Sequence, residues 1–347
     1  MMYKKNAFVA LIFVFLLAGI NAHAQGNLDD LLGAIAEEKE AGKRDAGKLV
    51  EGYISPFIKG FGYGLVSGWN NTAKPHKKFG VELTITANLS YVPDKDLLYN
   101  VGDMDLETVS LESSADDPNV PTVFGPNYEP VYRYNATNTT FNGPPGGDLE
   151  GEIGSAFVPV PMVHLGFGLP WETDIKVRFL PNISIGEDTK MNMWGVGLLH
   201  DFKQHIPVMK NMPFSLSVFA GYTRLNVETD LNSTLPQYNQ RALFGVNGFT
   251  AQVLISKKLS VVTFYGGLGY NAVSSNLDMK GQYDLNDDNI YDPVTDIEDP
   301  LSLKYSTGGA RATIGFRLKL SVITLHTDYT FQEYNTLSVG FGINVRD

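Results

Sequence analysis

The sequence predicts an all-β protein, an antiparallel transmembrane β-barrel of about ten to twelve strands with a short helical N-terminal segment. Three observations lead to this fold class: a secretory leader, an alternation of apolar and polar residues that continues to the end of the chain, and connections that alternate between long and short. Alternation with a period of two places one face of each strand in an apolar environment and the other in water. Sustained over many strands with charges on the wet face, it is typical of barrels that cross a membrane.

Residues 1–24 have the three parts of a signal peptide. Lys4 and Lys5 precede an apolar core over residues 7–20, and Ala22, His23 and Ala24 form an A-x-A cleavage site. No later segment reaches the roughly 18 uninterrupted apolar residues of a membrane-spanning helix. The sequence therefore predicts a secreted chain that crosses the membrane with strands.

Composition excludes several classes of function. The formal net charge is −11, and it becomes −13 when Lys4 and Lys5 are removed with the leader. A charge of this sign disfavours nucleic-acid binding, which needs a basic face to neutralise phosphates. The chain has no cysteine, so disulfides and thiolate-bound metal sites are excluded, and no cofactor is expected.

Residues 25–79 are predicted as a helical and glycine-rich segment ahead of the barrel. Leu28, Leu31, Leu32 and Ile35 follow helical spacing. A second helix is expected to start at Asp45 and to end near Pro56, followed by an irregular glycine-rich stretch over residues 60–79. Two interpretations are open: the segment plugs the lumen, or it is a periplasmic tether or interfacial helix.

Residues 80–347 are predicted as the barrel, with ten assignable strands. Long connections all fall on one side of this barrel and tight turns on the other, which is the usual pattern of bacterial barrels. With the N-terminus on the side of the tight turns, the long connections are expected outside the cell. A further hairpin from residues 106–111 and 130–134 would raise the count to twelve. The ten predicted strands are 80–92, 156–168, 173–180, 191–201, 213–228, 242–256, 260–276, 304–319, 322–332 and 336–345.

Charged side chains fall repeatedly on the wet face of these strands. A lysine or arginine that faces lipid at the membrane midplane costs about 2–4 kcal/mol, so these residues are expected inside the barrel. Their mixed charge predicts ion pairs across a narrow, largely filled interior. The predicted lumen-lining residues are Glu82, Lys176, Arg178, Arg311, Arg317, Lys319, His326 and Asp328.

An acidic stretch between the predicted strands 260–276 and 304–319 has the spacing of a calcium-binding loop. Asp284, Asn286, Asp288 and Asp292 supply oxygen ligands at positions 1, 3, 5 and 9. The bidentate glutamate usual at position 12 is missing, because Thr295 stands there. The alternative is an acidic, solvated loop without a metal.

Three stretches carry a resemblance to a known family: residues 69–76 (WNNTAKPH), 199–207 (LHDFKQHIP) and 213–222 (PFSLSVFAGY). In them the chain resembles an uncharacterised family of Gram-negative outer-membrane β-barrel proteins. The resemblance covers most of the mature chain and implies a barrel in the cell outer membrane, surrounded by its lipid. A more distant architectural similarity is to the long-chain fatty-acid transporters, barrels with an N-terminal hatch, although their strand number and motifs are absent.

The functional prediction is passage or binding of a small, hydrophobic ligand by an outer-membrane barrel that is not an enzyme. The alternative is a structural or surface-binding protein whose long connections contact something outside. A third hypothesis is an outer-membrane hydrolase, because His326 and Asp328 lie two apart on one strand face. Structural hydrogen bonding is the simpler interpretation of that pair.

Overall fold

The computed structural model describes residues 39–112, 117–186, 188–231, 238–283, 290–292 and 296–345. The predicted leader and the predicted helical repeat from Leu28 to Ile35 lie outside these residues. Among the described helices, none is long and apolar enough to span a membrane.

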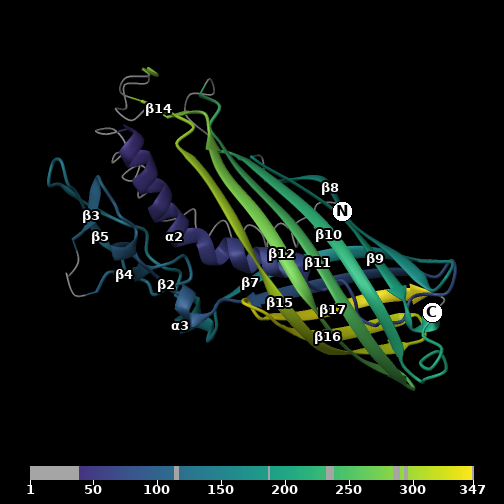
Figure 1. The fold of residues 1–347 in the computed structure, drawn as a ribbon. Coiled ribbons are helices and arrows are strands. Elements are labelled where there is room, and N and C mark those ends of the chain that lie inside the picture. Colours follow the sequence, from purple (N-terminus) through teal and green to yellow (C-terminus); the bar gives the residue numbers. More distant parts are fainter. Residues whose placement is uncertain are drawn as a thin grey trace.

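Ten antiparallel strands form one closed barrel, in which β1 pairs with β7 on one side and with β17 on the other (Figure 1). Each of the ten predicted strands has a counterpart, with ends that shift by a few residues. The barrel strands are β1 (Val81–Tyr91), β7 (Phe157–Leu169), β8 (Thr173–Ile185), β9 (Thr189–Asp201), β10 (Ser215–Asp230), β11 (Arg241–Leu259), β12 (Val262–Lys280), β15 (Leu301–Leu320), β16 (Ile323–Phe331) and β17 (Thr336–Val345).

The two ends of the barrel differ. At the long-connection end, β1 is joined to β7, β10 to β11, β12 to β15 and β16 to β17. The turn end carries residues 170–172, 202–214, 260–261 and 321–322. Strands β10, β11, β12 and β15 have 16 to 20 residues, whereas β1, β16 and β17 have 9 to 11. The longer strands project beyond the shorter ones at the long-connection end and form a curved, open sheet there (Figure 1).

The alternation read from the sequence sorts the side chains as a membrane barrel requires. On β15, Ile314 and Phe316 are exposed on the outer face, while Arg311 and Arg317 are buried. On β1, Leu83 and Ile85 are exposed and Glu82 is buried. Apolar groups therefore cover the outside of the barrel, and polar groups of the same strands point into it.

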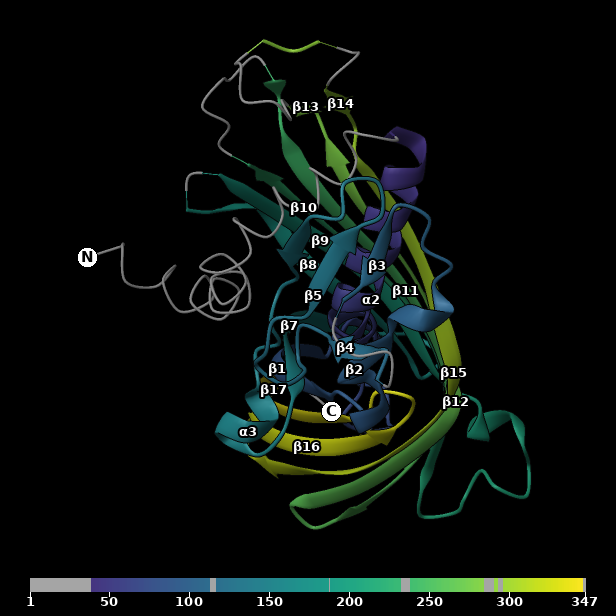
Figure 2. The ribbon, with the colours of Figure 1, turned by 90° about the vertical axis from the view of Figure 1, so that its left-hand side faces the viewer.

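Helix α2 (Lys39–Val66) passes from the open sheet at the long-connection end into the barrel (Figures 1 and 2). It differs from the predicted helix at both ends. Asp45 lies inside the helix, where its carboxylate accepts hydrogen bonds from the backbone of Glu107 and Thr108 instead of capping the helix. At the other end, the helix continues ten residues past Pro56. Pro56 cannot donate to the Gly52 carbonyl, and the Ser55 hydroxyl bonds that oxygen instead at 3.4 Å.

Glycines let the second half of α2 lie against the barrel wall. A Cβ atom added to Gly60, Gly62 or Gly64 would come within 2.5–2.6 Å of a side-chain carbon of Val158, Val273 or Val160, respectively. The glycine-rich composition predicted an irregular segment here, because glycine costs a helix about 0.5–1 kcal/mol per residue relative to alanine. Close packing against the wall offsets that cost, so the prediction of an irregular start at residue 60 was wrong.

The insertion between β1 and β7 forms small sheets outside the barrel rather than an eleventh and twelfth strand. Its largest sheet has the order β3-β5-β6, so the predicted hairpin pairs, but apart from the barrel. The insertion packs on the first half of α2, with Leu49 in a cluster with Val109 and Tyr132. The remaining elements are β2 (Leu98–Asn100), β3 (Val109–Leu111), β4 (Asn119–Pro121), β5 (Val131–Tyr134), β6 (Thr140–Asn142), α3 (Leu149–Ile153), β13 (Gln282–Tyr283) and β14 (Ile297–Glu298).

Candidate functional site

The candidate site is the barrel lumen together with the chain segment that fills it, which we call the plug (residues 57–79). Almost every residue from Gly60 to His76 is buried. The plug enters the barrel from the long-connection end as the second half of α2, and it reaches the turn end as an extended chain before β1 begins. The expectation that the N-terminal segment arrives from the side of the tight turns was wrong.

The half of the lumen nearer the long-connection end has an apolar inner wall. Phe61 of α2 packs edge-on to Phe244 of β11, with ring centroids 5.9 Å apart. Polar side chains usually line the interior of bacterial barrels, so an apolar lining is a departure from the common pattern. The inward-facing residues around the helix are Val158, Val160, Met162, Met191, Met193, Leu225, Val227, Val246 and Val273.

Cationic side chains of the wall bind the carboxyl-terminal end of α2. Arg178 donates to the carbonyls of Leu65 and Ser67, at 2.6 Å each, and its guanidinium lies 3.8 Å from the ring centre of Trp69. Arg311 donates to the Val66 carbonyl at 3.2 Å. The last carbonyls of a helix have no partner within the helix and carry partial negative charge, so cations are the matching partners.

Trp69 fixes the plug in the second half of the lumen. Its carbonyl accepts a hydrogen bond from Lys176 at 2.8 Å, and its ring packs 5.5 Å from that of Phe219. Gly197 and Gly221 make room for this pair, because an added Cβ at either position would lie 3.1 Å from the indole. The tryptophan is thus held by both its backbone and its ring.

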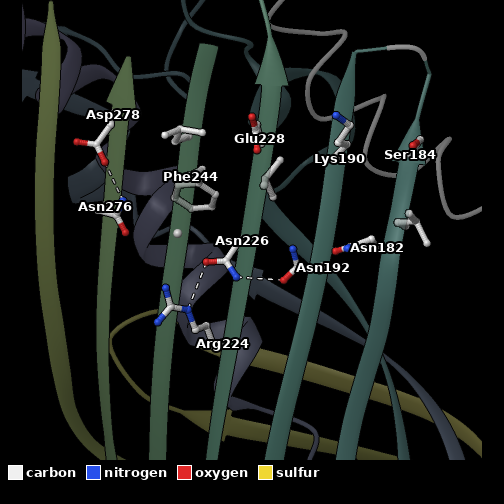
Figure 3. Close-up of a pocket in the computed structure, with 14 residues that line it drawn as sticks. Asn182, Ser184, Lys190, Asn192, Arg224, Asn226, Glu228, Phe244, Asn276 and Asp278 are labelled. Atoms are coloured by element: carbon white, nitrogen blue, oxygen red, sulfur yellow. Dashed lines mark hydrogen bonds between the residues drawn. The ribbon is translucent and has the colours of Figure 1, made fainter. Parts of the chain in front are cut away.

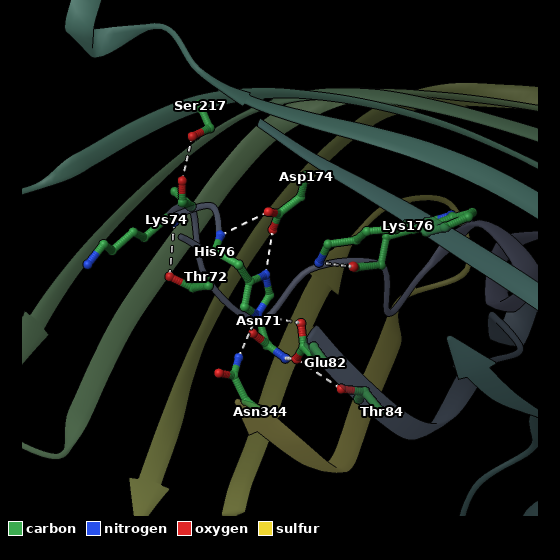
Figure 4. A network of polar contacts seen from close by, with 12 residues as sticks. Asn71, Thr72, Lys74, His76, Glu82, Thr84, Asp174, Lys176, Ser217 and Asn344 are labelled. Atoms are coloured by element: carbon green, nitrogen blue, oxygen red, sulfur yellow. Dashed lines mark hydrogen bonds and ion pairs between the residues drawn. The ribbon is translucent and has the colours of Figure 1, made fainter. Parts of the chain in front are cut away.

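A hydrogen-bond network around His76 closes the plug at the turn end (Figure 4). The Nδ1 atom of His76 lies 2.7 Å from a carboxylate oxygen of Asp174, whose other oxygen accepts from the His76 backbone at 2.9 Å. Its Nε2 atom lies 2.6 Å from Asn344 Nδ2 and 3.6 Å from Glu82. Asn71 donates to Glu82 at 2.6 Å. These contacts join the plug to three strands, β1, β8 and β17.

At the long-connection end, Glu333 fixes α2 to the connection between β16 and β17. Tyr63 donates to Glu333 at 3.0 Å, and its ring stacks on that of Tyr334 at 5.8 Å. Lys59 and Lys95 lie 4.0 and 3.6 Å from the same carboxylate. Partial burial raises the pKa of Glu333, but the hydrogen bonds and the two ammonium groups outweigh it and hold that pKa below its ordinary value.

The eight residues predicted to line the lumen all project to the inner side of the strands. Seven are buried and Lys319 is half-buried, with its ammonium 3.0 Å from Asn344. Asp328 accepts a hydrogen bond from Tyr265 at 2.8 Å, and His326 lies 3.5 Å from Thr86. Ion pairs between wall residues were predicted across the lumen. Instead, Lys176, Arg178 and Arg311 donate hydrogen bonds to backbone carbonyls of the plug.

Sequence reasoning missed the partners of these cations. Asp174 carried a usable signal, since it shares a strand face with Lys176 and Arg178. His76 and Asn71 had no periodicity to indicate a role, because they lie in an irregular segment, although both belong to the stretch 69–76 that carries the resemblance.

Three of the four predicted calcium ligands, Asp284, Asn286 and Asp288, lie outside the described residues. The fourth, Asp292, donates its backbone N–H to the carboxylate of Asp296 at 2.7 Å. Within the described ranges, no group of three or more histidine or carboxylate residues is arranged to hold a metal ion. The calcium site stays a prediction.

The projecting parts of β8 to β12 carry a polar hollow of about 590 Å³ (Figure 3). Its polar residues alternate along β9 and β10 with the buried methionines and aliphatic residues that contact α2. Arg224 donates to Asn226 at 3.3 Å, and Asn226 donates to Asn192 at 3.1 Å. Polar side chains on this outer face distinguish the projecting strands from the apolar belt nearer the turn end.

Solved structures with detectable similarity include several barrels. The attachment invasion locus protein Ail of Yersinia pestis is 8% identical, with a TM-score of 0.29 over 78% of this chain and 99% of that one. The translocator domain of the autotransporter NalP from Neisseria meningitidis is 10% identical, with a TM-score of 0.26 over 84% and 94%. A mutant of the monoaromatic hydrocarbon channel TodX is 8% identical, with a TM-score of 0.22 over 82% and 76%. TM-scores this low establish neither a common function nor a close structural relationship.

No curated protein matches the sequence. A family model, described as a family of unknown function (DUF6588), matches residues 2–345. This match covers the plug, the insertion and every strand of the barrel. The chain therefore belongs to the DUF6588 family.

Proposed function

We propose that the protein lies in the outer membrane and that its barrel binds and passes a small hydrophobic ligand when α2 shifts within the lumen. The observation that carries this proposal is the apolar inner wall around the second half of α2. The barrel is closed in the described structure because the plug fills its interior.

The distribution of exposed residues supports the membrane location. Apolar side chains on the outer face run from the turn end to aromatic residues such as Trp194, Tyr222 and Tyr270. Beyond them, the outer face becomes polar at Asn192, Arg224 and their neighbours. A belt of apolar residues about 25 Å tall with aromatic residues at its edge is what a bilayer requires of a barrel.

The character of the wall supports an apolar ligand. If α2 moves, the side chains that it covers become the lining of a tube, and most of them are aliphatic or methionine. Methionine is flexible and polarizable, so Met162, Met191 and Met193 can repack around ligands of different shape. Gly60 and Gly64 face β7, and Gly62 faces β12 on the other side of α2, so these three positions place no side chain between the helix and those strands.

A reversible lock between α2 and the wall tests the proposal. The native chain has no cysteine, and an added Cβ at Gly62 lies 3.4 Å from the Cβ of Val273. This separation is close to the range of about 3.5–4.5 Å that a disulfide needs. In G62C/V273C, we expect oxidation to weaken saturable binding of the apolar probe 1-aminoanthracene about tenfold, and reduction to restore it.

The two single-cysteine variants serve as matched controls, since oxidation cannot lock either of them. The protein is held in amphipol, so that the probe has no bilayer in which to dissolve. Absence of saturable probe binding to the reduced double variant and to the native protein would contradict a hydrophobic ligand site. Equal binding in the locked and reduced forms would show that movement of α2 is not needed.

The second candidate is a surface-binding protein, favoured by the ordered insertion over the first half of α2. Arg44 pairs with Glu107 at 2.9 Å, Lys48 donates to the Asp105 carbonyl at 2.7 Å, and Tyr53 donates to the Pro145 carbonyl at 3.0 Å. Through these contacts, the insertion and the first half of α2 form one unit at the long-connection end. A ligand recognised there would bind equally well with the disulfide closed, so the same experiment separates the two candidates.

A further inference from the structure

Strands β7 and β8 pair with each other along only part of their length. Their pairing covers the part nearer the turn end and stops at His164 and Arg178. Beyond that point, residues 157–163 and 179–185 are not paired with each other, although both strands lie wholly within the described part of the chain. On its other side, each strand is paired along nearly all its length, β7 with β1 and β8 with β9. We call these two unpaired stretches the seam.

Prolines in the sequence account for the seam. The amide of Gly168 donates to the Gly80 carbonyl at 2.9 Å, so even-numbered residues of β7 direct their backbone groups to β1 and odd-numbered ones direct theirs to β8. Pro159 and Pro161 are therefore on the β8 side, where neither has an N–H to donate. If the register of the paired part is continued, Pro161 lies opposite Pro181 of β8. Two facing prolines have no backbone donor, so the ladder cannot continue through them.

The seam begins at the outer edge of the apolar belt. Phe179 of β8 is paired with Trp194 of β9, one of the aromatic residues at that edge. Val163 and Phe179, on the two sides of the seam, are 40% and 64% exposed. Just beyond, the pairing of β8 with β9 shifts its register between Leu180 and Ile183, and such a bulge bends a strand. The start of the seam is therefore within reach of membrane lipid.

The inner side of the seam belongs to the apolar wall around α2. Val158 and Val160 of β7 lie directly against Gly60 and Gly64 of the helix. Met162 belongs to the same apolar cluster, in which β8 also takes part. Met162 is only 2% exposed, so side chains separate this wall from the outside where backbone pairing is missing. A passage can form at the seam without the loss of hydrogen bonds between strands, which an opening elsewhere in the wall would require.

We propose that the seam is a lateral portal, through which an apolar molecule dissolved in the membrane exchanges with the wall beside α2. This inference rests on the proposed hydrophobic ligand and adds the route by which it enters. Both ends of the lumen are occupied, one by α2 with the insertion and the other by the His76 network. An unpaired strand edge can also accept a strand from a partner protein, but the prolines oppose this, because strand addition needs backbone donors.

Restoring the missing donors tests the cause of the seam. In P161V/P181V, both positions regain an N–H and valine favours strands, so we expect pairing to extend into the seam. Hydrogen exchange should then show added protection of the amides of the seam. Pro213→Val, at the turn end, is the matched control and should add none there. Unchanged protection in the double variant would overturn the assignment of the seam to its prolines. Heat-dependent mobility on gels identifies a variant that fails to fold, and Pro161→Val then takes its place.

A membrane-dissolved reagent tests the portal without any ligand. The native chain has no cysteine, so single cysteines can be placed at Met162, behind the seam, and at Val246, on the inner face of β11. In nanodiscs, N-pyrenylmaleimide reaches either position only through the barrel. We expect P161V/P181V to slow labelling of Met162→Cys about tenfold, because restored hydrogen bonds must break first, and to leave Val246→Cys unchanged. No labelling of Met162→Cys with the native prolines, an equal rate in both backgrounds, or equal slowing at both positions would overturn the portal.

Failure of the portal and failure of the hydrophobic ligand give different results. If both proposals hold, P161V/P181V slows association of 1-aminoanthracene from nanodisc lipid and keeps its equilibrium affinity, because the wall is unchanged. Slowed labelling of Met162→Cys, without saturable probe binding to the native protein, supports the portal and rejects the ligand. Saturable probe binding with equal association rates in both proteins rejects the portal and assigns entry to an end of the lumen.

Discussion

Arg178 shows how one residue links the barrel to its plug. A buried arginine on a barrel strand is expected to pair with a carboxylate, yet this one binds two backbone carbonyls and an indole ring. The carbonyls belong to the end of α2, where the helix leaves them without internal partners. Arg178 therefore takes the place of a helix cap, supplied by a residue more than a hundred positions away.

Replacement of Arg178 tests this role. In Arg178→Gln, the shorter neutral side chain leaves buried carbonyls at Leu65 and Ser67 unbonded, and each costs about 1–3 kcal/mol. The barrel should still close, because its strand pairing is untouched, but trypsin should now cut the plug after Lys59. Arg224→Gln, on the outer face of β10, is the control and should leave the cutting pattern unchanged. Identical resistance of both variants would contradict the role of Arg178.

Glu333 makes the docking of α2 at the long-connection end of the barrel depend on pH. Its folded pKa lies below the ordinary value of 4.5, so its contribution to stability is present above that value and is lost as the pH falls through the folded pKa. Acidification to about pH 3 should therefore lower the urea midpoint for release of α2, measured by tryptophan fluorescence. The urea midpoint of Glu333→Gln should fall less over the same pH range. An equal loss in both proteins would assign the pH dependence to other groups.

At the scale of elements, the strands could be predicted and the helix only in part. Strand faces follow from local alternation, as in Ile314 and Phe316 against Arg311 and Arg317, and neighbours in the chain are neighbours in the sheet. The end of α2 depends on contacts with residues far away in sequence, such as Val158 and Val273. From the sequence alone, the glycines between residues 60 and 64 indicate an irregular segment. The barrel wall against which they pack as a helix is visible only in the structure.

Two glycines of α2 provide a matched comparison. In Gly64→Ala, the added carbon would lie 2.5 Å from Val160, so overpacking costs about 1–3 kcal/mol. That cost exceeds the gain of about 0.5–1 kcal/mol in helix propensity. In Gly47→Ala, the nearest atoms are at 3.9 Å on Leu301 and Leu303, so the propensity gain remains.

Hydrogen exchange of the backbone amides of α2 measures both effects. Protection over residues 60–66 should fall in Gly64→Ala and stay the same or rise in Gly47→Ala. Higher protection in both variants would mean that the glycines of the second half are not needed for docking.

At the scale of the whole molecule, the course of the N-terminal segment was the least predictable feature. The eight lumen residues could be predicted from strand parity, because a charge on the wet face must point inward. Parity does not reveal what meets those charges in the lumen, nor from which end the segment enters. Two clusters of buried residues answer both questions: Ala46 shares one with Leu301, and Trp69 shares another with Leu254. They place the start of α2 at the long-connection end and the exit of the plug at the turn end.

This course predicts which residues reach the cell surface. If the protein lies in the outer membrane with its long connections outside, the first half of α2 is external, although it precedes the barrel in sequence. A cysteine at exposed Glu51 should react with a membrane-impermeant maleimide in intact cells, and one at exposed Lys257 should react only after permeabilisation. A cysteine at Tyr128, in the exposed part of the insertion, reports the side of the long connections independently. In intact cells, labelling of the cysteine at position 128 but not of that at position 51 would contradict the threaded course. Labelling of the cysteine at position 257 but not of that at position 128 would show that the barrel has the opposite orientation, and it would not contradict the threading.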